Sequence, residues 1–283
     1  MTGTNPRTAL VTGASSGIGE ATAKRLRSAG FVTYGAARRT DRLQALEDHG
    51  VRTLPLDVTD DDSARACFDR ILDEAGQLDV LVNNAGYGSF GAVEDVSFDE
   101  AHRQFEVNIF GAMRMARLAL PHMRARRSGT IINVSSIAGR MAAPLGGWYH
   151  ASKFAIEALS DSLRMEVAPY GIRVVVIEPG QIATEFNVER RQTLVRASVN
   201  GPYADLTRAA LSALLDNPAR LRRASPPSVV ADAIHRSVLA RRPRTRYPVG
   251  NTASSLLWAR AILPDRWLDA MIMRMYGSPT TTA

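Results

Sequence analysis

Short apolar, β-branched runs alternate with longer amphipathic stretches along most of this chain, and that alternation leaves few folds open to it. Strands that alternate with helices predict βαβ units and a parallel sheet. Strands that are continuously apolar predict helices on both faces of that sheet. The predicted strands are Thr8–Thr12, Phe31–Ala36, Val51–Leu56, Val80–Asn83, Thr130–Val134, Ile172–Glu178 and a short seventh at Thr245–Val249, and the predicted helices include Ile18–Ser28, Asp60–Glu74, Phe98–Arg126 and Ala151–Val167.

No change of composition and no linker divides the 283 residues, so we expect a single α/β domain over 1–283, with a doubly wound parallel sheet of about seven strands. Residues 181–226 are long and helical in pattern, and lie beyond the last long strand, where an insertion meets the ligand-binding edge of such a sheet. They form either a substrate lid or a packed pair of surface helices. A helical tail at 252–277 carries Trp267, Met271 and Met275 at helical spacing. Such a stripe indicates core or a subunit interface, with shallow membrane contact as the less favoured alternative.

Charge and cysteine content narrow the class of protein further. The net charge is +7, but the arginines are scattered and no aromatic residues interleave with them, so a solvated surface is favoured over nucleic-acid binding. The lone cysteine, Cys67, excludes a disulfide within the chain and fits a reducing compartment. The start of the sequence lacks the pattern of a secretory signal, and no apolar window is long enough to span a bilayer. We therefore expect a soluble cytoplasmic protein.

A glycine-rich turn follows the first predicted strand and leads directly into the first predicted helix. Backbone N–H groups at such a turn and the dipole of the helix favour a phosphate anion, and the glycines allow it to approach closely. A plain tight turn is the alternative for three glycines alone, and the G-x-x-x-G-x-G spacing differs from the commoner fingerprint. With strand and helix in place, the segment predicts a dinucleotide site held by Gly13, Ser15, Ser16, Gly17, Ile18 and Gly19.

The end of the second predicted strand selects the nucleotide. An acidic residue there would bind a ribose 2′-hydroxyl and repel a 2′-phosphate, whereas an arginine attracts the phosphate. The chain has Arg38 and Arg39 at this point, and no carboxylate before Asp41. NADP is therefore favoured over NAD, with Arg38 as the phosphate contact and Arg39 as a second candidate.

Two later strand ends add candidates for the same nucleotide. Asp57 and Val58 follow the third strand and could bracket an adenine, with the carboxylate accepting from its amino group; a helix N-cap or a turn is the alternative. Asn84, Ala85 and Gly86 close the fourth strand, where a turn is again the alternative.

The sharpest signal is a tyrosine and a lysine four residues apart, Tyr149 and Lys153, with Ser136 upstream at a strand end. Residues at this spacing share one helix face. An ammonium about 5 Å from the phenol, at an effective dielectric of about 20, favours phenolate by about 3 kcal/mol, or about two pK units. The positive nicotinamide ring of an oxidised nucleotide would add to this effect, so the predicted tyrosine pKa is about 7 to 8. Such a phenol can exchange a proton with an alkoxide at neutral pH, while Ser136 donates to the same oxygen.

These motifs, in this order, resemble those of the short-chain dehydrogenase/reductase family, in its shorter single-domain branch with a Rossmann fold. The resemblance spans Thr8 to about Thr184 and rests on T-G-x-x-x-G-x-G, N-N-A-G, the serine, Y-x-x-x-K and Pro179-Gly180. It implies that Asn108 holds a water in a proton relay through Lys153, which also binds the nicotinamide ribose. It assigns Asp57 and Val58 to adenine, and Pro179, Gly180, Ile182 and Thr184 to the nicotinamide side. The resemblance also implies a homodimer or homotetramer, with no metal in catalysis.

The combined expectation is an NADP-dependent oxidoreductase that interconverts a ketone or aldehyde and an alcohol, with Asn108, Ser136, Tyr149 and Lys153 as catalytic residues. Similarity of residues 181–226 and the tail to retinol and hydroxysteroid dehydrogenases favours a lipophilic small molecule. A reductase of acyl chains on a carrier protein or coenzyme A is the alternative within the enzyme class, and a non-catalytic NADP sensor is the alternative outside it. The expected apolar pocket wall comprises Phe90, Met141, Leu145, Trp148, Phe186 and the lid that residues 181–226 would form.

Overall fold

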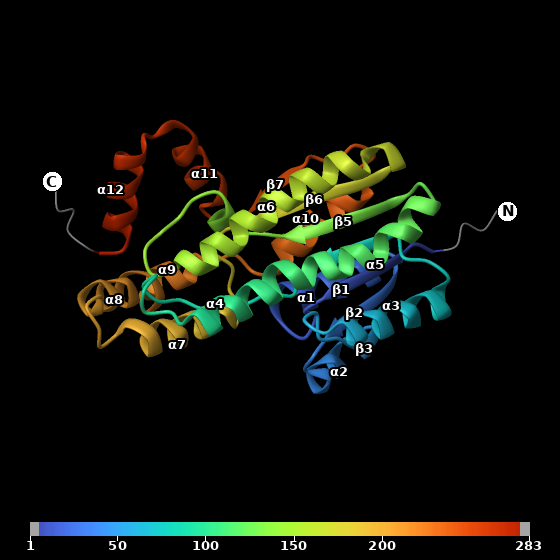
Figure 1. Ribbon diagram of the computed structural model, residues 1–283, viewed down its shortest axis with the longest axis horizontal. Helices are drawn as coiled ribbons and strands as arrows, with labels where there is room; N and C mark the ends of the chain where they lie inside the picture. The colour runs from blue at the N-terminus through green and yellow to red at the C-terminus, as the bar shows by residue number, and fades with distance from the viewer. Residues whose placement is uncertain (1–5, 278–283) are drawn as a thin grey trace.

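Seven parallel strands form one sheet in the computed structural model, which describes residues 6–277 (Figure 1). The sheet order is β3-β2-β1-β4-β5-β6-β7, and β1 pairs with β2 on one side and β4 on the other. The strand order therefore reverses at β1, which confirms the doubly wound prediction. The strands are β1 Thr8–Thr12, β2 Val32–Ala37, β3 Arg52–Pro55, β4 Val80–Asn83, β5 Gly129–Val134, β6 Ile172–Pro179 and β7 Arg246–Val249.

Helices cover both faces of the sheet because successive strand residues point to opposite sides. Val11 packs into a cluster with Leu26 of α1 (Gly17–Ser28) and Ile234 of α10 (Ser228–Leu239). The adjacent Leu10 packs on the other side against α3 (Asp61–Ala75) and α5 (Ala112–Ala125). Cys67 of α3 lies in this second cluster, where burial raises its pKa to about 12, as befits a packing residue. The remaining elements of these layers are α6 (Gly147–Val167) and the short η1 (Thr40–Leu43), α2 (Gln44–Glu47), η3 (Ile137–Gly139) and η4 (Ala168–Tyr170).

The helix predicted over Phe98–Arg126 is interrupted by a wider turn. It consists of α4 (Phe98–Phe105), a π-helical segment η2 (Glu106–Gly111) and then α5. Gly111 closes the π segment, where an added Cβ would lie 2.7 Å from Val58 Cγ2. The prediction of one regular α-helix was wrong at this point, and the irregular turn carries Asn108.

Residues 181–226 and the tail form a helical layer beyond the carboxyl edge of the sheet. The first segment contains α7 (Phe186–Ser198), α8 (Ala204–Ala210), η5 (Leu211–Leu215) and α9 (Pro218–Arg222), and the tail contains α11 (Ala253–Ile262) and α12 (Asp265–Met275). Leu211 and Leu214 share a third apolar cluster with Leu268 and Ile272, so the two segments pack together at the end of the molecule near the C-terminus (Figure 1). Their predicted helical character is confirmed.

The buried stripe of the tail differs from the predicted one. Trp267 is 71% exposed, whereas Leu268 and Ile272 are each 5% exposed. The helix is therefore rotated so that the tryptophan points outward, because the apolar partners on η5 face the leucine and isoleucine. None of the helices within residues 6–277 is both long and apolar enough to cross a bilayer.

Candidate active site

A cavity of about 890 Å³ opens at the carboxyl ends of the parallel strands, and residues of α7 and α12 form part of its lining. In a doubly wound sheet this edge is the usual ligand site. Nineteen residues were predicted to bind the nucleotide, and all except Gly19 line the cavity. Of the four predicted catalytic residues, all except Asn108 line it. The lining set is Gly13, Ser15, Ser16, Gly17, Ile18, Arg38, Arg39, Asp57, Val58, Asn84, Ala85, Gly86, Ser136, Tyr149, Lys153, Pro179, Gly180, Ile182 and Thr184.

The turn between β1 and α1 has the geometry of an anion cradle. Gly13 has φ +66° and Gly17 has φ +59°, a left-handed conformation that side chains disfavour. A Cβ on Gly13 would lie 2.8 Å from Ala85 Cα, and one on Gly19 would lie 2.3 Å from the Gly13 carbonyl oxygen. Gly19 therefore packs behind the turn rather than lining the cavity. The amides at the start of α1 face the space that these glycines leave open.

The loop after β4 braces the same turn. The amide of Asn84 donates through Nδ2 to the carbonyl oxygens of Thr12, at 3.0 Å, and Gly13, at 3.2 Å. In return Thr12 Oγ1 accepts from the backbone N–H groups of Asn84 and Ala85, at 3.1 and 3.0 Å. The Asn84 side chain thus holds the glycine turn in shape. Thr12 was not predicted as a site residue, although its polar side chain inside a buried strand end was a signal.

Positive charge gathers where β2 ends. Arg38 and Arg39 are exposed and line the cavity. Arg39 Nη2 lies 3.3 Å from Ser15 Oγ and 3.5 Å from Ser16 Oγ, so this guanidinium reaches across the glycine turn. A weak pair with Glu185, at 3.8 Å, is its one carboxylate contact within residues 6–277.

Asp57 lines the cavity, but its side chain also stabilises a local turn, which was the alternative role expected from the sequence. Its Oδ1 accepts from the backbone N–H of Thr59 at 2.9 Å and from the Thr59 hydroxyl at 2.7 Å. Burial acts to raise the pKa of this carboxyl, but the bonds from Thr59 and the charges of Arg38 and Arg114 hold it below its ordinary value. Asp57 is therefore a fixed negative acceptor at the rim.

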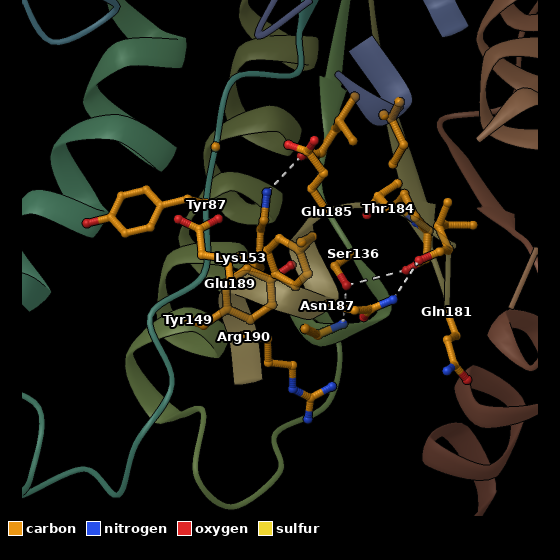
Figure 2. Close-up of a pocket in the computed structure, with 18 of the residues that line it drawn as sticks. Tyr87, Ser136, Tyr149, Lys153, Gln181, Thr184, Glu185, Asn187, Glu189 and Arg190 are labelled. Carbon is orange, nitrogen blue, oxygen red and sulfur yellow. Dashed lines mark hydrogen bonds between the residues drawn. The ribbon is translucent and has the colours of Figure 1, made fainter. Parts of the chain in front are cut away.

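Ser136, Tyr149 and Lys153 come from two elements and meet at one wall (Figure 2). Tyr149 and Lys153 lie one turn apart on α6, and Lys153 Nζ is 5.9 Å from the centre of the Tyr149 ring. The ammonium also donates to the Val134 carbonyl oxygen at 3.0 Å. Ser136 precedes η3, where its hydroxyl accepts from the Ala138 N–H at 3.1 Å. The three residues thus line one wall of the cavity, with the ammonium on the side of the Tyr149 ring.

The protonation states differ from the sequence prediction. Burial raises the pKa of Tyr149 to about 12, although the Ser136 hydroxyl and the Arg190 guanidinium act in the opposite direction. Burial also lowers the pKa of Lys153 to about 8, against the attraction of Glu157. The predicted tyrosine pKa of about 7 to 8 is wrong for these residues by themselves, because that reasoning counted the lysine charge but not the loss of solvent around the phenol.

Asn108 supports the wall from behind. It is 3% exposed and sits in the π-helical segment. Its Nδ2 donates to the Tyr87 carbonyl oxygen at 2.9 Å and to Ser152 Oγ at 3.0 Å, and its Oδ1 accepts from the Tyr87 N–H at 3.0 Å. A Cβ on Gly86 would lie 3.1 Å from that Oδ1 and 3.8 Å from Lys153 Nζ. The asparagine and the lysine therefore flank the same glycine without a direct hydrogen bond between them.

The substrate side of the cavity differs in part from the expected wall. Phe90, Met141 and Phe186 line it as predicted. Leu145 is instead 4% exposed within the third apolar cluster. Trp148 points away, because its Nε1 donates to the Val93 carbonyl oxygen at 3.2 Å and its ring packs on those of Phe98 and Phe105. The prediction did not name several further lining residues individually, among them Arg190, Leu215, Arg220, Ile272, Met275 and Tyr276. They follow no motif, and their helical periodicity alone does not show which side faces a cavity.

Comparisons with known proteins agree with this arrangement. A family model described as short chain dehydrogenase matches residues 7–195. A 3-ketodihydrosphingosine reductase of Bacteroides thetaiotaomicron is 37% identical over 274 residues, covering 96% of this chain and 98% of that protein. An NADPH-dependent 3-dehydrocapnine reductase of Ornithobacterium rhinotracheale is 33% identical over 279 residues, covering 95% and 96%. The crystal structure of a short-chain dehydrogenase from Streptomyces avermitilis superposes with a TM-score of 0.80 at 30% identity, covering 96% of this chain and 97% of that one.

Proposed function

This chain belongs to the short-chain dehydrogenase/reductase family of oxidoreductases, and from that premise we propose that it is an NADP-dependent reductase of a ketone or aldehyde, with Tyr149 as its acid/base. The observation that carries the proposal is the convergence of Ser136, Tyr149 and Lys153 on one wall of a cavity whose other end is a glycine cradle. A nucleotide held in the cradle and a carbonyl group at the wall would share one enclosed space.

The cradle fits a dinucleotide on grounds internal to the structure. Side chains at Gly13 and Gly19 would collide with neighbouring backbone, so the turn keeps open the space that a pyrophosphate needs. The exposed guanidiniums of Arg38 and Arg39 stand beside that turn, where a 2′-phosphate would find two cations. The name of the relative from Ornithobacterium rhinotracheale, which specifies NADPH, supports the same choice.

The protonation state of Tyr149 supports its role as the proton donor in reduction. NADPH, when bound, supplies the hydride that reduces the carbonyl carbon. With a pKa raised to about 12, Tyr149 keeps its proton at neutral pH. A protonated phenol is the donor that a forming alkoxide requires, so Tyr149 in this state can act as the acid in reduction. The names of two relatives as reductases support this direction.

The neighbouring groups have separate tasks. Ser136, whose hydroxyl already acts on the phenol, orients the carbonyl oxygen and donates to it. Lys153 holds a positive charge beside Tyr149 and stabilises the phenolate that remains after proton transfer. Asn108 fixes the Tyr87 backbone and Ser152 around the lysine, and we propose that it orders the water that returns a proton to Tyr149 through Lys153.

The substrate end of the cavity indicates a lipophilic molecule. Phe90, Met141 and Phe186 line it, with Leu215 and Ile272 from residues 181–226 and the tail. Such a wall stabilises an apolar substrate by removing its surface from water. We propose that 181–226 serves as the substrate lid, because its helix α7 lines the cavity with Phe186–Arg190 and with Gln192.

Replacement of Tyr149 by Phe tests the proton donor. The Tyr149→Phe variant removes the hydroxyl and leaves the ring contacts with Phe90 and Phe186 in place, at 5.1 and 5.4 Å between ring centres. We expect kcat for NADPH-dependent reduction of medium-chain ketones and aldehydes to fall by about a hundredfold or more. Nucleotide affinity, measured by fluorescence titration with NADPH, should change less than about threefold. Full turnover in this variant would refute the assigned role, and an inactive wild type that still binds NADPH would favour the sensor alternative.

Replacement of Arg38 by Asp tests the nucleotide. The wild type should use NADPH in preference to NADH, since the arginine attracts a 2′-phosphate and aspartate would repel it. In Arg38→Asp we expect kcat/KM for NADPH to fall by about tenfold to a hundredfold, with kcat/KM for NADH unchanged or raised. The reference variant is Arg42→Asp, which removes an exposed arginine that pairs with Glu185 at 2.9 Å but does not line the cavity. Equal use of both nucleotides by the wild type would contradict NADP preference.

A further inference from the structure

Two guanidinium groups stand in the substrate end of the cavity, Arg190 on α7 and Arg220 on α9. Their surroundings are otherwise largely apolar and include Leu214, Ile272 and Met275. Two like charges in such a wall are unfavourable unless an anion compensates them. Neither arginine takes part in the reduction proposed above, so their presence requires another explanation.

Arg190 is held in place but not neutralised. Its Cζ lies 4.7 Å from the centre of the Phe90 ring, and its Nη2 lies 3.3 Å from the Tyr276 hydroxyl. Its Nε is buried and has no hydrogen-bond partner in the described part of the chain. A buried N–H of a charged group without an acceptor is costly, and an anionic ligand would supply that acceptor. Figure 2 shows the guanidinium directed away from Glu185 and into the space below Tyr149.

Arg220 shares the same uncompensated state. Burial and the charge of Arg190 both lower its pKa, so the two guanidiniums act on each other across the cavity. Between residues 6 and 277, neither forms an ion pair with an aspartate or glutamate, whereas the adjacent Arg191 pairs with Asp216 at 3.0 Å. Arg191, which faces solvent on α7, thus has a carboxylate partner, whereas Arg190 and Arg220, which line the cavity, have none among the described residues.

The pair is separate from the nucleotide cradle. Glu185, directly before α7, lies 3.8 Å from Arg39, and the charges of Arg38 and Arg39 act on Glu189 of that helix, so this side of the helix faces the end of β2. Arg190 instead contacts Phe90 and Tyr276, at the opposite end of the cavity. A nucleotide phosphate beside Arg38 would therefore not compensate the positive charges of Arg190 and Arg220.

We propose that Arg190 and Arg220 bind an anionic group of the substrate, so that the molecule reduced is an amphipathic carbonyl compound with an apolar chain and a carboxylate, phosphate or sulfonate. This inference rests on the proposed reductase function and names its substrate class. The apolar wall takes the chain, the two guanidiniums take the anion, and Tyr149 and Ser136 take the carbonyl oxygen. Three contacts of different chemistry would fix the orientation of the substrate as well as its affinity.

The test compares charged and neutral ketones of equal chain length. The probes are methyl octyl ketone and its derivatives that carry a carboxylate, phosphate or sulfonate, either beside the carbonyl group or at the chain end. We expect the wild type to have a kcat/KM at least about tenfold higher for one or more anionic probes than for the neutral ketone. The arms with different anions identify which oxyanion the pair accepts. Arg190→Gln and Arg220→Gln should each reduce that preference by about tenfold or more, and Arg190→Lys should restore part of it.

A control variant and the use of a ratio of rate constants make the outcome decisive. Arg191→Gln, one residue along α7 and outward facing, should leave the ratio of kcat/KM for charged and neutral ketones unchanged. The ratio also cancels any effect of Arg190 on the pKa of Tyr149, since both probes share that step. An unchanged ratio in Arg190→Gln and Arg220→Gln, in variants whose thermal unfolding matches the wild type, would overturn the inference while the reductase function stands.

A binding measurement separates failure of the inference from failure of the proposed function. If the wild type reduces none of the probes, calorimetric titration with decanoate and decanol still reports on the arginines. Tighter binding of decanoate that is lost in Arg190→Gln supports the anion site even though the proposed reaction fails. Equal affinity for the two probes, or decanoate binding that survives in both variants, refutes the anion site.

Discussion

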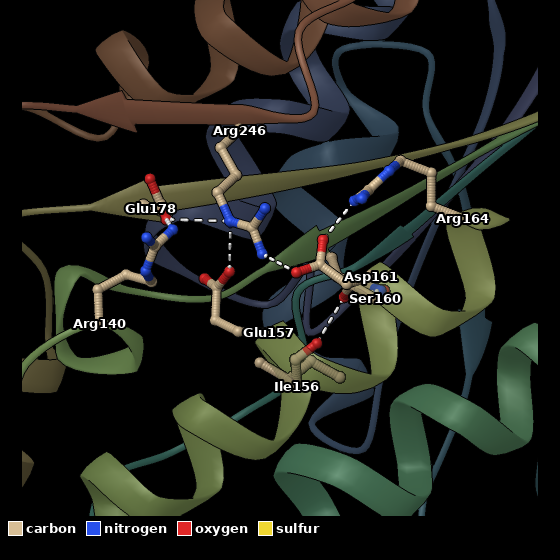
Figure 3. A network of polar contacts seen from close by, with 9 residues as sticks. Arg140, Ile156, Glu157, Ser160, Asp161, Arg164, Glu178 and Arg246 are labelled. Atoms are coloured by element: carbon tan, nitrogen blue, oxygen red, sulfur yellow. Dashed lines mark hydrogen bonds and ion pairs between the residues drawn. The ribbon is translucent and has the colours of Figure 1, made fainter.

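The side chain of Glu157 lies one helical turn beyond Lys153 on α6 and belongs to an ion-pair network at the back of the active site (Figure 3). Arg246 Nε lies 2.9 Å from Glu157 Oε2 and 3.6 Å from Glu178 Oε1, and its Nη2 lies 2.6 Å from Asp161 Oδ2. Glu157 is only 5% exposed, so its charge is weakly screened. Burial lowers the pKa of Lys153 to about 8, and the charge of Glu157 acts in the opposite direction by raising that pKa. The network thus keeps the lysine charged near neutral pH.

This coupling predicts a pH profile. The ammonium of Lys153 is present below its pKa of about 8 and is lost above it, so kcat/KM for NADPH, which reports the free enzyme, should be level at lower pH and fall as pH rises past about 8. In Glu157→Gln the favourable charge is absent, so the decline should begin at lower pH by about half a unit or more. Asp161→Asn is the control, because it removes a contact of Arg246 without a direct effect on the lysine. A profile that moves equally in both variants would indicate a general effect on folding instead.

The spacing of the motif identified the right residues but not their protonation. Y-x-x-x-K placed Tyr149 and Lys153 on one face of a helix, and the structure has them on one wall. The direction of the tyrosine pKa depends on how much solvent the fold removes, and that comes from chain segments far from the motif, such as Phe90 and Phe186. Local sequence gives the charge of a neighbour but not the burial of the pair.

At the scale of the elements, the strands and the helices α1 and α3 could be predicted to within one residue at each end, since each has a strong apolar period, whereas α6 begins at Gly147, four residues before the predicted start at Ala151. The π-helical turn at Glu106–Gly111 could not be predicted, because its residues have ordinary helical character. The wider turn places Asn108 against the Tyr87 backbone and Ser152. Single wide turns of this kind often occur at functional sites, and here the turn positions a residue of the catalytic wall.

The helices of residues 181–226 and the tail show the same limit. Their periodicity predicted helices, but on α12 Trp267 points outward and Leu268 inward. Which face of a helix is covered depends on its neighbour, and these helices pack on each other rather than on the sheet. From the sequence, a charged residue such as Arg190 is expected on the solvent-exposed surface. Only the packing of the helices shows that it lines the cavity.

On the scale of the whole molecule, large apolar side chains remain exposed across α4, η2 and α6. Phe98 is 71% exposed, Phe110 55%, Phe154 45% and Met165 66%. The three elements lie in contact, since η2 joins α4 and packs against α6. Apolar residues grouped on adjoining elements indicate a surface that another protein covers. This surface supports the homodimer or homotetramer expected from the family resemblance.

We expect light scattering after size-exclusion chromatography to report a homodimer or homotetramer. Paired Phe110→Glu and Phe154→Glu substitutions should shift the population toward monomer, because each buries a charge in the proposed interface. Trp258→Glu is the matched control, since this tryptophan is 67% exposed but lies on α11, away from that face. A monomeric wild type, or dissociation by the control alone, would refute the assignment of this face.

The cavity draws its two ends from different stretches of the chain. The family model covers residues 7–195, whereas Leu214, Arg220, Ile272 and Met275, which also line the cavity, lie beyond it. Substitutions at these later positions can therefore alter the proposed substrate wall while Ser136, Tyr149 and Lys153 stay unchanged. For protein engineers, exchange of these later lining residues between related proteins is a way to change substrate selectivity.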